Sequence, residues 1–163
     1  MVMNSGFVRA MERGEEAQVD SLLRDAFGGE DEVRLVHRLR RDGSMAGESV
    51  LPGSDGLFGY YALSWMRAPE GWLCLAPVAI RSRDQRCGHG RRMIRQLGEW
   101  ARLSGTYVVV LGDPGFYGTA GFDSARARHL AAPYPVSHLL LAGPGDAAPQ
   151  ATLVYPAAFA ALD

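Results

Sequence analysis

The strongest hydrophobic pattern lies in the middle of the chain, where an apolar run at 75–80 predicts a buried strand. A charged segment ends this run, and Gly88 and Gly90 then mark a turn. Beyond the turn, the apolar positions follow helical spacing; they are Met93, Ile94, Leu97, Trp100 and Ala101. The stretch therefore predicts a strand, a glycine turn and an amphipathic helix over 91–103 that buries one face.

Two more amphipathic helices are predicted earlier in the chain. A short strand within 6–11 precedes Gly14-Glu15-Glu16, which opens the first helix, and Gly28-Gly29 ends it. The acidic run at 30–32 suits the start of a second helix, because negative side chains interact favourably with the positive end of the helix dipole. The arginines within 38–41 suit its other end.

Strands are predicted around these helices. The runs at 46–51, 57–66 and 72–80 are separated by short turns, which favours antiparallel hairpins. The β-branched run at 106–111 predicts a strand buried on both faces. The order strand, helix, strand implies a right-handed crossover between parallel strands. The predicted fold class is α/β (α+β), with a mixed central sheet that is antiparallel at first and parallel at its centre, and helices on its faces.

The C-terminal part is less regular. The segments 139–141 and 152–155 are candidates for edge strands, and the loop at 143–150 is rich in Gly, Pro and Ala and is expected to be exposed. No repeat and no second domain is evident. A chain of 163 residues that is 47% hydrophobic suits one domain over 1–163.

Charge and cysteine content limit the partners. A net charge of -1 makes no electrostatic case for nucleic-acid binding, whereas the local excess of arginine at 81–95 suits a small ligand that bears phosphate. Cys74 and Cys87 have no metal-ligand spacing and form no framework of pairs. No apolar run approaches the ~18 residues of a membrane span, and no signal pattern opens the chain. We therefore expect a cytoplasmic protein with no membrane partner.

The glycine turn has a specific physical use. The start of a helix leaves backbone N–H groups without intrahelical partners, and the dipole makes that end partly positive. Glycines let the backbone approach a ligand, so that several N–H groups can point at one anion. The alternative is a plain connector between strand and helix. The glycine spacing alone does not separate these two interpretations.

Two motifs in the right order resemble the GNAT acyltransferases. Residues 85–90, Gln-Arg-Cys-Gly-His-Gly, match the family's Q/R-x-x-G-x-G/A signature, and a V-x-I strand precedes them. Residues 112–122 resemble its second landmark, a Tyr five places before the Phe of a Gly-Phe pair. Residues 132–136 and 154–159 resemble the tail of the YhbS-like bacterial subgroup, so the resemblance covers nearly the whole chain.

The resemblance implies that the two central strands splay apart and that acetyl-CoA or another acyl-CoA lies in the V-shaped gap, with no metal. The N–H groups of 86–91 would then hold the pyrophosphate, and backbone groups of the preceding strand would pair with the pantetheine arm. The residues expected to bind the cofactor are Val78, Ile80, Gln85, Arg86, Cys87, Gly88, His89, Gly90 and Arg91. His89 departs from the small or apolar residue of many relatives, and we expect its ring to be solvated rather than in contact with a phosphate.

Tyr117 matches the family position whose phenol protonates the departing thiolate. The alternative is a half-buried packing residue. No general base is identifiable: Asp113 is the nearest carboxylate, Glu70, Glu48 and His37 are weaker candidates, and many relatives use ordered water. Cys87 lies at a helix start, where thiolate is favoured, but no His or acid is placed to activate it, so covalent catalysis is rejected.

The function that follows is an N-acetyltransferase, in which an amine attacks the acetyl-CoA thioester directly. Phe58, Tyr60, Tyr61, Trp65 and Met66 could shape the acceptor pocket or belong to the core. Small amines, antibiotics, peptide N-termini and protein lysines all stay open as acceptors, and the resemblance allows a homodimer. One rival is a non-catalytic acyl-CoA-binding or regulatory module. A domain for ATP or NAD fits poorly, because the required phosphate-binding motifs are missing.

Overall fold

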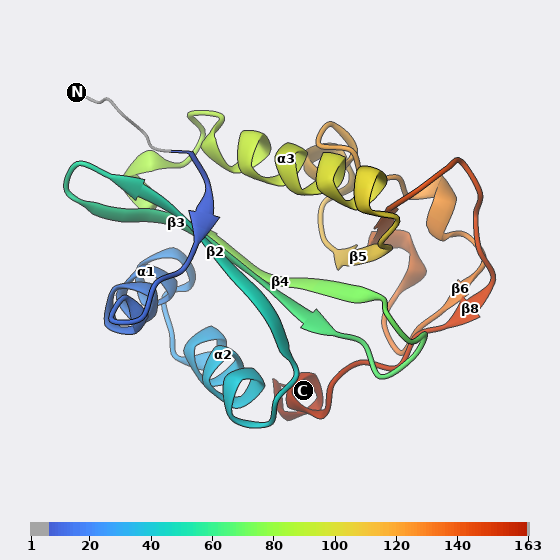
Figure 1. Cartoon of the computed structure of the whole chain (residues 1–163), viewed down its shortest axis with the longest axis horizontal. Helices are drawn as coiled ribbons and strands as arrows, with labels where there is room; N and C mark the ends of the chain where they lie inside the picture. The colour runs from blue at the N-terminus through green and yellow to red at the C-terminus, as the bar shows by residue number, and fades with distance from the viewer. Residues whose placement is uncertain (1–6, 163) are drawn as a thin grey trace.

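A six-stranded sheet forms the centre of the computed structural model, which describes residues 7–162 (Figure 1). Its strands run in the order β1-β2-β3-β4-β5-β7. Their bounds are β1 Arg9–Ala10, β2 Met45–Gly53, β3 Gly56–Trp65, β4 Leu73–Ile80, β5 Val108–Leu111 and β7 Leu139–Ala142. All neighbours pair antiparallel except β4 and β5, which are parallel. The predicted mixed sheet with a parallel pair near its centre is confirmed. The predicted strand within 6–11 is β1, and residue 6 lies outside the described residues.

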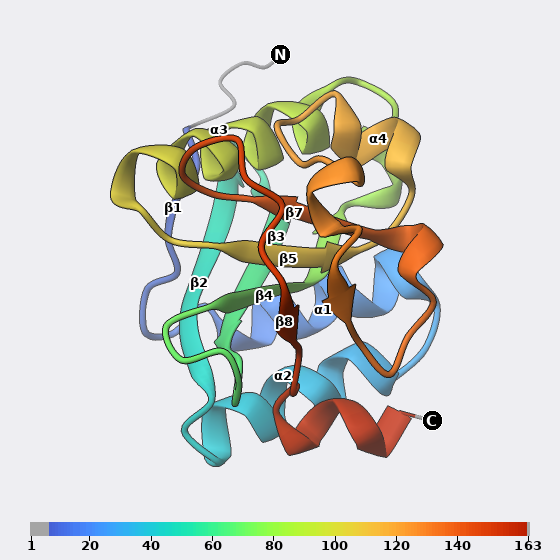
Figure 2. The same ribbon diagram turned by 90° about the vertical axis from the view of Figure 1, so that its right-hand side faces the viewer.

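Helices cover both faces of this sheet. The helices α1 (Glu16–Phe27) and α2 (Asp31–Arg41) lie on one face, and α3 (His89–Ser104) lies on the other (Figures 1 and 2). The three predicted helices are confirmed, with ends that differ by one or two residues. Glycines in the left-handed conformation end two of them: Gly28 closes α1 and Gly105 closes α3.

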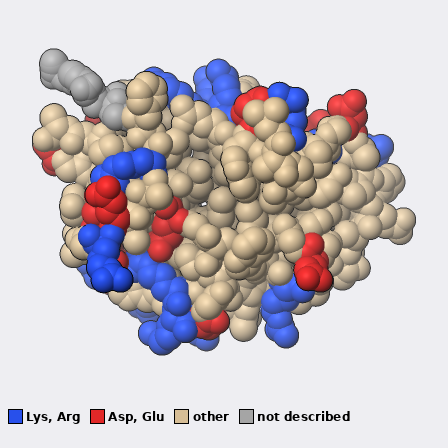
Figure 3. Space-filling model, viewed as in Figure 1, with Lys and Arg blue, Asp and Glu red and all other residues tan. Residues whose placement is uncertain are grey.

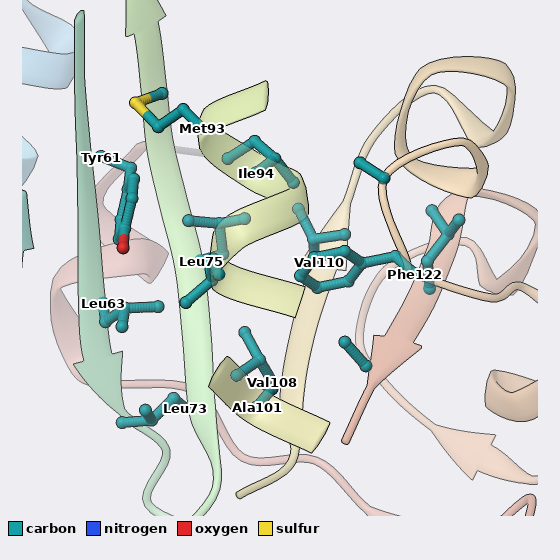
Figure 4. Close-up of a cluster of buried hydrophobic side chains, with 14 of the residues drawn as sticks. Tyr61, Leu63, Leu73, Leu75, Met93, Ile94, Ala101, Val108, Val110 and Phe122 are labelled. Carbon is teal, nitrogen blue, oxygen red and sulfur yellow. The ribbon is translucent and has the colours of Figure 1, made fainter. Parts of the chain in front are cut away.

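The face of the sheet under α3 carries the largest apolar cluster (Figure 4). Met93 and Ile94 from α3 pack with Leu75 of β4 and Val110 of β5. Gly98 lets α3 approach the turn after Tyr117 closely, since a Cβ at this position would lie 2.8 Å from the carbonyl oxygen of Ala120. The helix is thereby held at a fixed height above the two parallel strands.

The opposite face holds a polar network inside an apolar cluster. The Tyr60 hydroxyl donates to Glu48 Oε1 at 2.6 Å, and the Arg40 guanidinium donates to the same carboxylate at 2.8 Å. Burial and the nearby Glu48 charge raise the pKa of Tyr60. This network ties α2 to β2 and β3.

The C-terminal segment forms short elements outside the main sheet. They are α4 (Pro114–Gly118), β6 (Leu130–Ala131), β8 (Ala151–Thr152) and the 3-10 helices η2 (Ala125–Ala127), η3 (Val136–His138) and η4 (Ala157–Leu162). A further 3-10 helix, η1 (Ser82–Asp84), lies earlier in the chain, between β4 and α3. The segment 139–141 is an edge strand as predicted, but 152–155 is not part of the main sheet. Its first residue pairs with β6 instead, and Val154 bridges to Ala68. The Arg126 guanidinium holds the loop between these segments through three carbonyl oxygens, which leads the chain away from the sheet.

Charged side chains are spread over the surface. On the face drawn in Figure 3, basic and acidic side chains lie intermixed, and most of the surface is uncharged. No helix within residues 7–162 is long and apolar enough to cross a membrane.

Candidate active site

The two parallel strands separate part-way along β4. Pairing between β4 and β5 runs from Leu73↔Val108 to Leu75↔Val110 and then stops, whereas β4 continues to Ile80. On its other side, β4 remains paired with β3 up to Gly59↔Ile80. The edge of β4 from 76 to 80 that faces β5 therefore has no strand beside it. The expected splay is present.

A bulge in β4 lies where the strands separate. Tyr61 pairs with Val78 and Leu63 pairs with Leu75, so two residues of β4, at 76 and 77, face Ala62 alone. Bulges bend a strand and are common beside active sites. The bulge begins directly after the last pair of β4 with β5, so it coincides with the point where the two strands separate.

The loop between β4 and α3 is curled by left-handed residues. Arg86 has a φ of 67° and Gly88 has a φ of 85°, and such a conformation is unfavourable for a residue with a side chain. The N–H groups of Arg86, Cys87 and Gly88 donate to no acceptor among the described residues. The first turn of α3 adds further N–H groups without intrahelical partners. The loop thus presents a concentration of hydrogen-bond donors at the positive end of a helix.

A cavity of about 540 Å³, called the loop cavity here, lies between this loop and the open edge of β4. It is lined by Val78, Ile80, Asp84, Gln85, Arg86, Gly88, Gly90, Arg91, Phe116 and Tyr117. Its one acidic group, Asp84, is held by Arg81 at 2.6 Å. Arg86 and Arg91 have no carboxylate partner among the described residues, so the loop cavity is net positive.

Seven of the nine residues predicted to bind the cofactor line the loop cavity, and two do not. The Cys87 side chain is exposed and approaches only the Gln85 carbonyl oxygen, at 3.6 Å. The His89 ring packs edge-on against Phe58 with centroids 4.9 Å apart, and its Nδ1 is shielded from solvent. The His89 ring is thus half-buried beside Phe58 and is not among the residues that line the loop cavity.

Gly90 was predicted to let the backbone approach a ligand, and the structure shows that it also has a role in packing. A Cβ at this position would lie 3.3 Å from Ile80 Cγ1 and 3.5 Å from Phe116 Cζ. A glycine therefore lets the first turn of α3 lie close to the end of β4 and to α4. At Gly88 a Cβ would meet only open space, and the left-handed φ is what favours glycine there.

Tyr117 stands at the end of the loop cavity. Asp113 caps the short helix α4 by accepting from the Gly115 N–H at 3.0 Å, and α4 carries Tyr117. The Tyr117 ring lies on Gly112, where any Cβ would overlap it. Desolvation raises the pKa of Tyr117 to about 12. Its hydroxyl donates no hydrogen bond to any described residue.

A second cavity of about 350 Å³, called the aromatic cavity here, lies on the other side of Tyr117. Val78 and Tyr117 line both cavities. The rest of its wall is Phe27, Glu32, Leu35, Cys74, Leu75, Ala76, Pro77, Val110, Leu111, Tyr134, Tyr155 and Phe159. Three of its aromatic rings pack against one another. The centroid of the Tyr155 ring lies 5.1 Å from that of Tyr134 and 5.8 Å from that of Phe159.

Comparisons with known proteins agree with this geometry. The chain is 31% identical over 122 residues to YhbS of Escherichia coli K12, described as an uncharacterized N-acetyltransferase, and the match covers 72% of this chain and 73% of YhbS. The crystal structure of E. coli YhbS, a GNAT family N-acetyltransferase in complex with CoA, superposes with a TM-score of 0.86 at 26% identity, over 98% of this chain and 94% of that one. This chain belongs to the GNAT family.

A second GNAT structure is also similar. A GNAT family acetyltransferase from Brucella melitensis in complex with acetyl-CoA has a TM-score of 0.76 at 25% identity, over 93% of this chain and 96% of that one. No protein-family model matches the chain.

The aromatic residues that the sequence suggested for the acceptor side of this GNAT protein do not line the aromatic cavity. Phe58, Tyr60, Tyr61 and Met66 are buried in the core, and Trp65 is 49% exposed. The rings that do line it come mainly from the C-terminal segment. Residues 132–136 and 154–159 resembled a GNAT subgroup, and that resemblance was the only sequence signal for Tyr134, Tyr155 and Phe159.

The four candidate bases lie elsewhere among the described residues. Asp113 caps α4, Glu48 is held by Arg40 and Tyr60, and His37 bonds to Asp20 at 3.0 Å. Glu70 lines neither cavity. Glu32, which no sequence pattern singled out for this site, lines the aromatic cavity. Within residues 7–162, no three His, Cys, Asp or Glu side chains are grouped so that they could hold a metal ion.

Proposed function

We propose that this protein transfers the acetyl group of acetyl-CoA to the primary amine of an acceptor, with residues 1–163 as one acyltransferase domain. One observation carries the proposal. Two cavities open onto the unpaired edge of β4 and meet at Val78 and Tyr117, so that a cofactor in one can meet an acceptor in the other. Relatives that bind CoA and acetyl-CoA on the same fold support it.

The loop cavity fits the phosphate end of the cofactor. Free N–H groups at a helix start, together with the unpaired guanidinium groups of Arg86 and Arg91, suit a pyrophosphate. The pantetheine arm would run along the open edge of β4 and pair with backbone groups near Val78 as an added strand does. In this arrangement the Gln85 side chain, which donates to the Ile80 carbonyl oxygen at 2.9 Å, limits how far that pairing extends.

Tyr117 is proposed as the acid of the reaction. The acceptor nitrogen attacks the thioester carbonyl carbon, a C–N bond forms, and the tetrahedral intermediate collapses with cleavage of the C–S bond. The departing thiolate takes the Tyr117 proton, and the phenolate regains a proton from solvent. An acceptor that binds as an ammonium ion first loses one proton to water, which frees the lone pair for attack, and the nitrogen loses a second proton to water after the C–N bond forms. A raised pKa keeps the Tyr117 phenol protonated until the thiolate forms.

The first test is calorimetric titration of acetyl-CoA, and separately of ATP and NAD, into the purified protein. We expect micromolar binding of acetyl-CoA alone. Release of free thiol would then be followed with a panel of amines. All 17 basic side chains are arginine, so acetylation of the protein's own lysines cannot contribute to the signal. Absence of acetyl-CoA binding would contradict the proposal, and binding with no thiol release for any amine would favour a non-catalytic module.

The loop cavity is tested by Gly88→Glu. A carboxylate there would occupy the anion site and repel a pyrophosphate, so the dissociation constant for acetyl-CoA should rise at least ~100-fold. Gly71→Glu is a matched control, because Gly71 and Gly88 share a φ of 85° and both have open space for a Cβ. Both variants carry the same backbone strain and charge. Equal acetyl-CoA binding by the two would place the phosphate site elsewhere.

A further inference from the structure

We infer that the acceptor is a small primary amine with a single positive charge on an apolar or aromatic body, and that Glu32 binds its ammonium group. The inference rests on the proposed acetyl transfer. It adds the substrate class and a residue that determines specificity. The cavity in question is the aromatic cavity on the far side of Tyr117.

The wall of the aromatic cavity is mainly apolar, with the phenols of three tyrosines among its rings. Rings of Phe27, Tyr134, Tyr155 and Phe159 and aliphatic side chains from β4 and β5 make up most of it. Among its described lining residues, Glu32 is the one charged group, and there is no Arg or His. Such a wall favours an apolar body, and the faces of aromatic rings also attract cations.

Glu32 differs from its neighbours in having no partner. At the same helix start, Glu30 pairs with Arg24 at 2.6 Å, and Asp31 pairs with Arg34. Glu32 is half-buried and forms no ion pair or hydrogen bond with any described residue. The Glu32 carboxylate is therefore available to pair with a cation that enters the aromatic cavity. An ammonium group in the aromatic cavity supplies that cation.

The position and size of the cavity narrow the acceptor further. Glu32 lies on α2, and η4, which carries Phe159, lies beside α2 (Figure 2). Both residues line the aromatic cavity, so α2 and the C-terminal segment contribute to the same wall. A volume of about 350 Å³ lies at the small end of the range for ligand sites. One carboxylate can neutralise one ammonium group. Polycations leave charges unpaired in an apolar site, and acceptors with a carboxylate are repelled by Glu32.

The substrate class is tested with matched pairs of amines. We expect 2-phenylethylamine to be acetylated with a kcat/KM at least ~10-fold above that of phenylalanine, which adds only a carboxylate. Hexylamine should likewise exceed 1,6-diaminohexane, which adds only a second charge, by at least ~10-fold. A preference for phenylalanine, for the diamine, for an aminoglycoside or for a lysine-containing peptide would overturn the inference.

The role of Glu32 is tested by Glu32→Gln and Glu32→Asp. Because the carboxylate acts on acceptor binding, Glu32→Gln should raise the KM for 2-phenylethylamine about 10-fold and change kcat less than about twofold. Glu32→Asp should restore most of the loss, since it keeps the charge. Asp31→Asn is the matched control: it removes a charge one residue away in the same helix turn, outside the cavity, and should leave the amine KM unchanged.

The two levels of the proposal fail in different ways. Calorimetry with acetyl-CoA is run on every variant, and the affinity should match that of the unmodified protein. If acetyl-CoA does not bind the unmodified protein, acetyl transfer itself is wrong. If acetyl-CoA binds and amines are acetylated, but Glu32→Gln has an unchanged amine KM or behaves as Asp31→Asn does, only the assignment of Glu32 is wrong.

Discussion

At the scale of single residues, the surroundings of Tyr117 distinguish a general acid from a packing residue. Its ring is held by Gly112 on one face and by Phe116 and Phe122 at centroid distances of 4.9 and 5.9 Å. A purely structural tyrosine of this kind would bury its hydroxyl against a partner. This hydroxyl has no partner among the described residues and lies where two cavities meet. The environment therefore favours the acid role.

The acid role of Tyr117 predicts a selective loss on removal of its hydroxyl. Tyr117→Phe should lower kcat about 100-fold, the lower end of the effect of a general acid, and should leave the acetyl-CoA affinity nearly unchanged. Steady-state kinetics and calorimetry on the same preparation separate the two quantities. A variant with full activity would remove the proposed role.

The pH dependence gives a second test of Tyr117. A neutral acid is active below its pKa, so a pKa of about 12 keeps Tyr117 protonated well above the range in which an ordinary phenol, with a pKa of about 10, begins to ionise. We expect kcat to show no fall between pH 8 and 10 that depends on this residue. Profiles of kcat against pH for the unmodified protein and Tyr117→Phe would check this, and a tyrosine-dependent fall below about pH 10 would contradict it.

At the scale of elements, helix periodicity predicted α1, α2 and α3 well, because each buries a continuous apolar stripe. It did not predict α4, which has five residues and depends on Asp113 and Pro114 at its start. Nor did it predict how closely α3 approaches its neighbours. That distance depends on glycines at the contact, whose role is visible only when both surfaces are known.

Gly98 gives a prediction about this contact. In an exposed helix, Gly→Ala would stabilise the protein by about 1 kcal/mol. Here the added methyl would lie 2.8 Å from the Ala120 carbonyl oxygen, and such overpacking typically costs ~1–3 kcal/mol. We therefore expect Gly98→Ala to lower the free energy of unfolding by about 1 kcal/mol, measured by urea denaturation. Arg92→Ala, on the exposed side of α3, is the control. A gain in stability for Gly98→Ala would mean that the turn moves away freely.

At the scale of the whole molecule, buried phenols should make the fold sensitive to alkali. Burial raises the pKa of Tyr60, Tyr61 and Tyr155 above the usual value. In the unfolded chain these groups lose their protons near pH 10, whereas in the folded protein they keep them. The folded state then binds more protons, so the stability that these phenols contribute is full below about pH 10 and is lost as the pH rises further.

Urea denaturation at several pH values would measure this effect. Each phenol that stays protonated should cost about 1.4 kcal/mol per pH unit above about pH 10. Burial also raises the pKa of the Cys74 thiol, to about 12, so the decline of the midpoint should begin near pH 9 and become steep by pH 11, where the phenols contribute as well. Tyr61→Phe should reduce the slope, since one such group is removed. A midpoint that stays constant to pH 11 would contradict the argument.

The sequence by itself determined the elements of the main sheet, the three long helices and the glycine turn, because these depend on local periodicity and backbone preference. Only the tertiary structure decided where β4 and β5 separate, since that depends on a bulge and on where pairing stops. It also decided which aromatic rings line the aromatic cavity. Tyr60 and Tyr61 lie on a predicted strand that was a candidate for the acceptor pocket, but both are buried. Tyr134, Tyr155 and Phe159 reach the cavity instead, through a C-terminal segment that folds back onto α2. Contacts between residues more than a hundred positions apart leave no local pattern, which is why the grouping of Glu32 with those rings in one cavity could be found only in the folded chain.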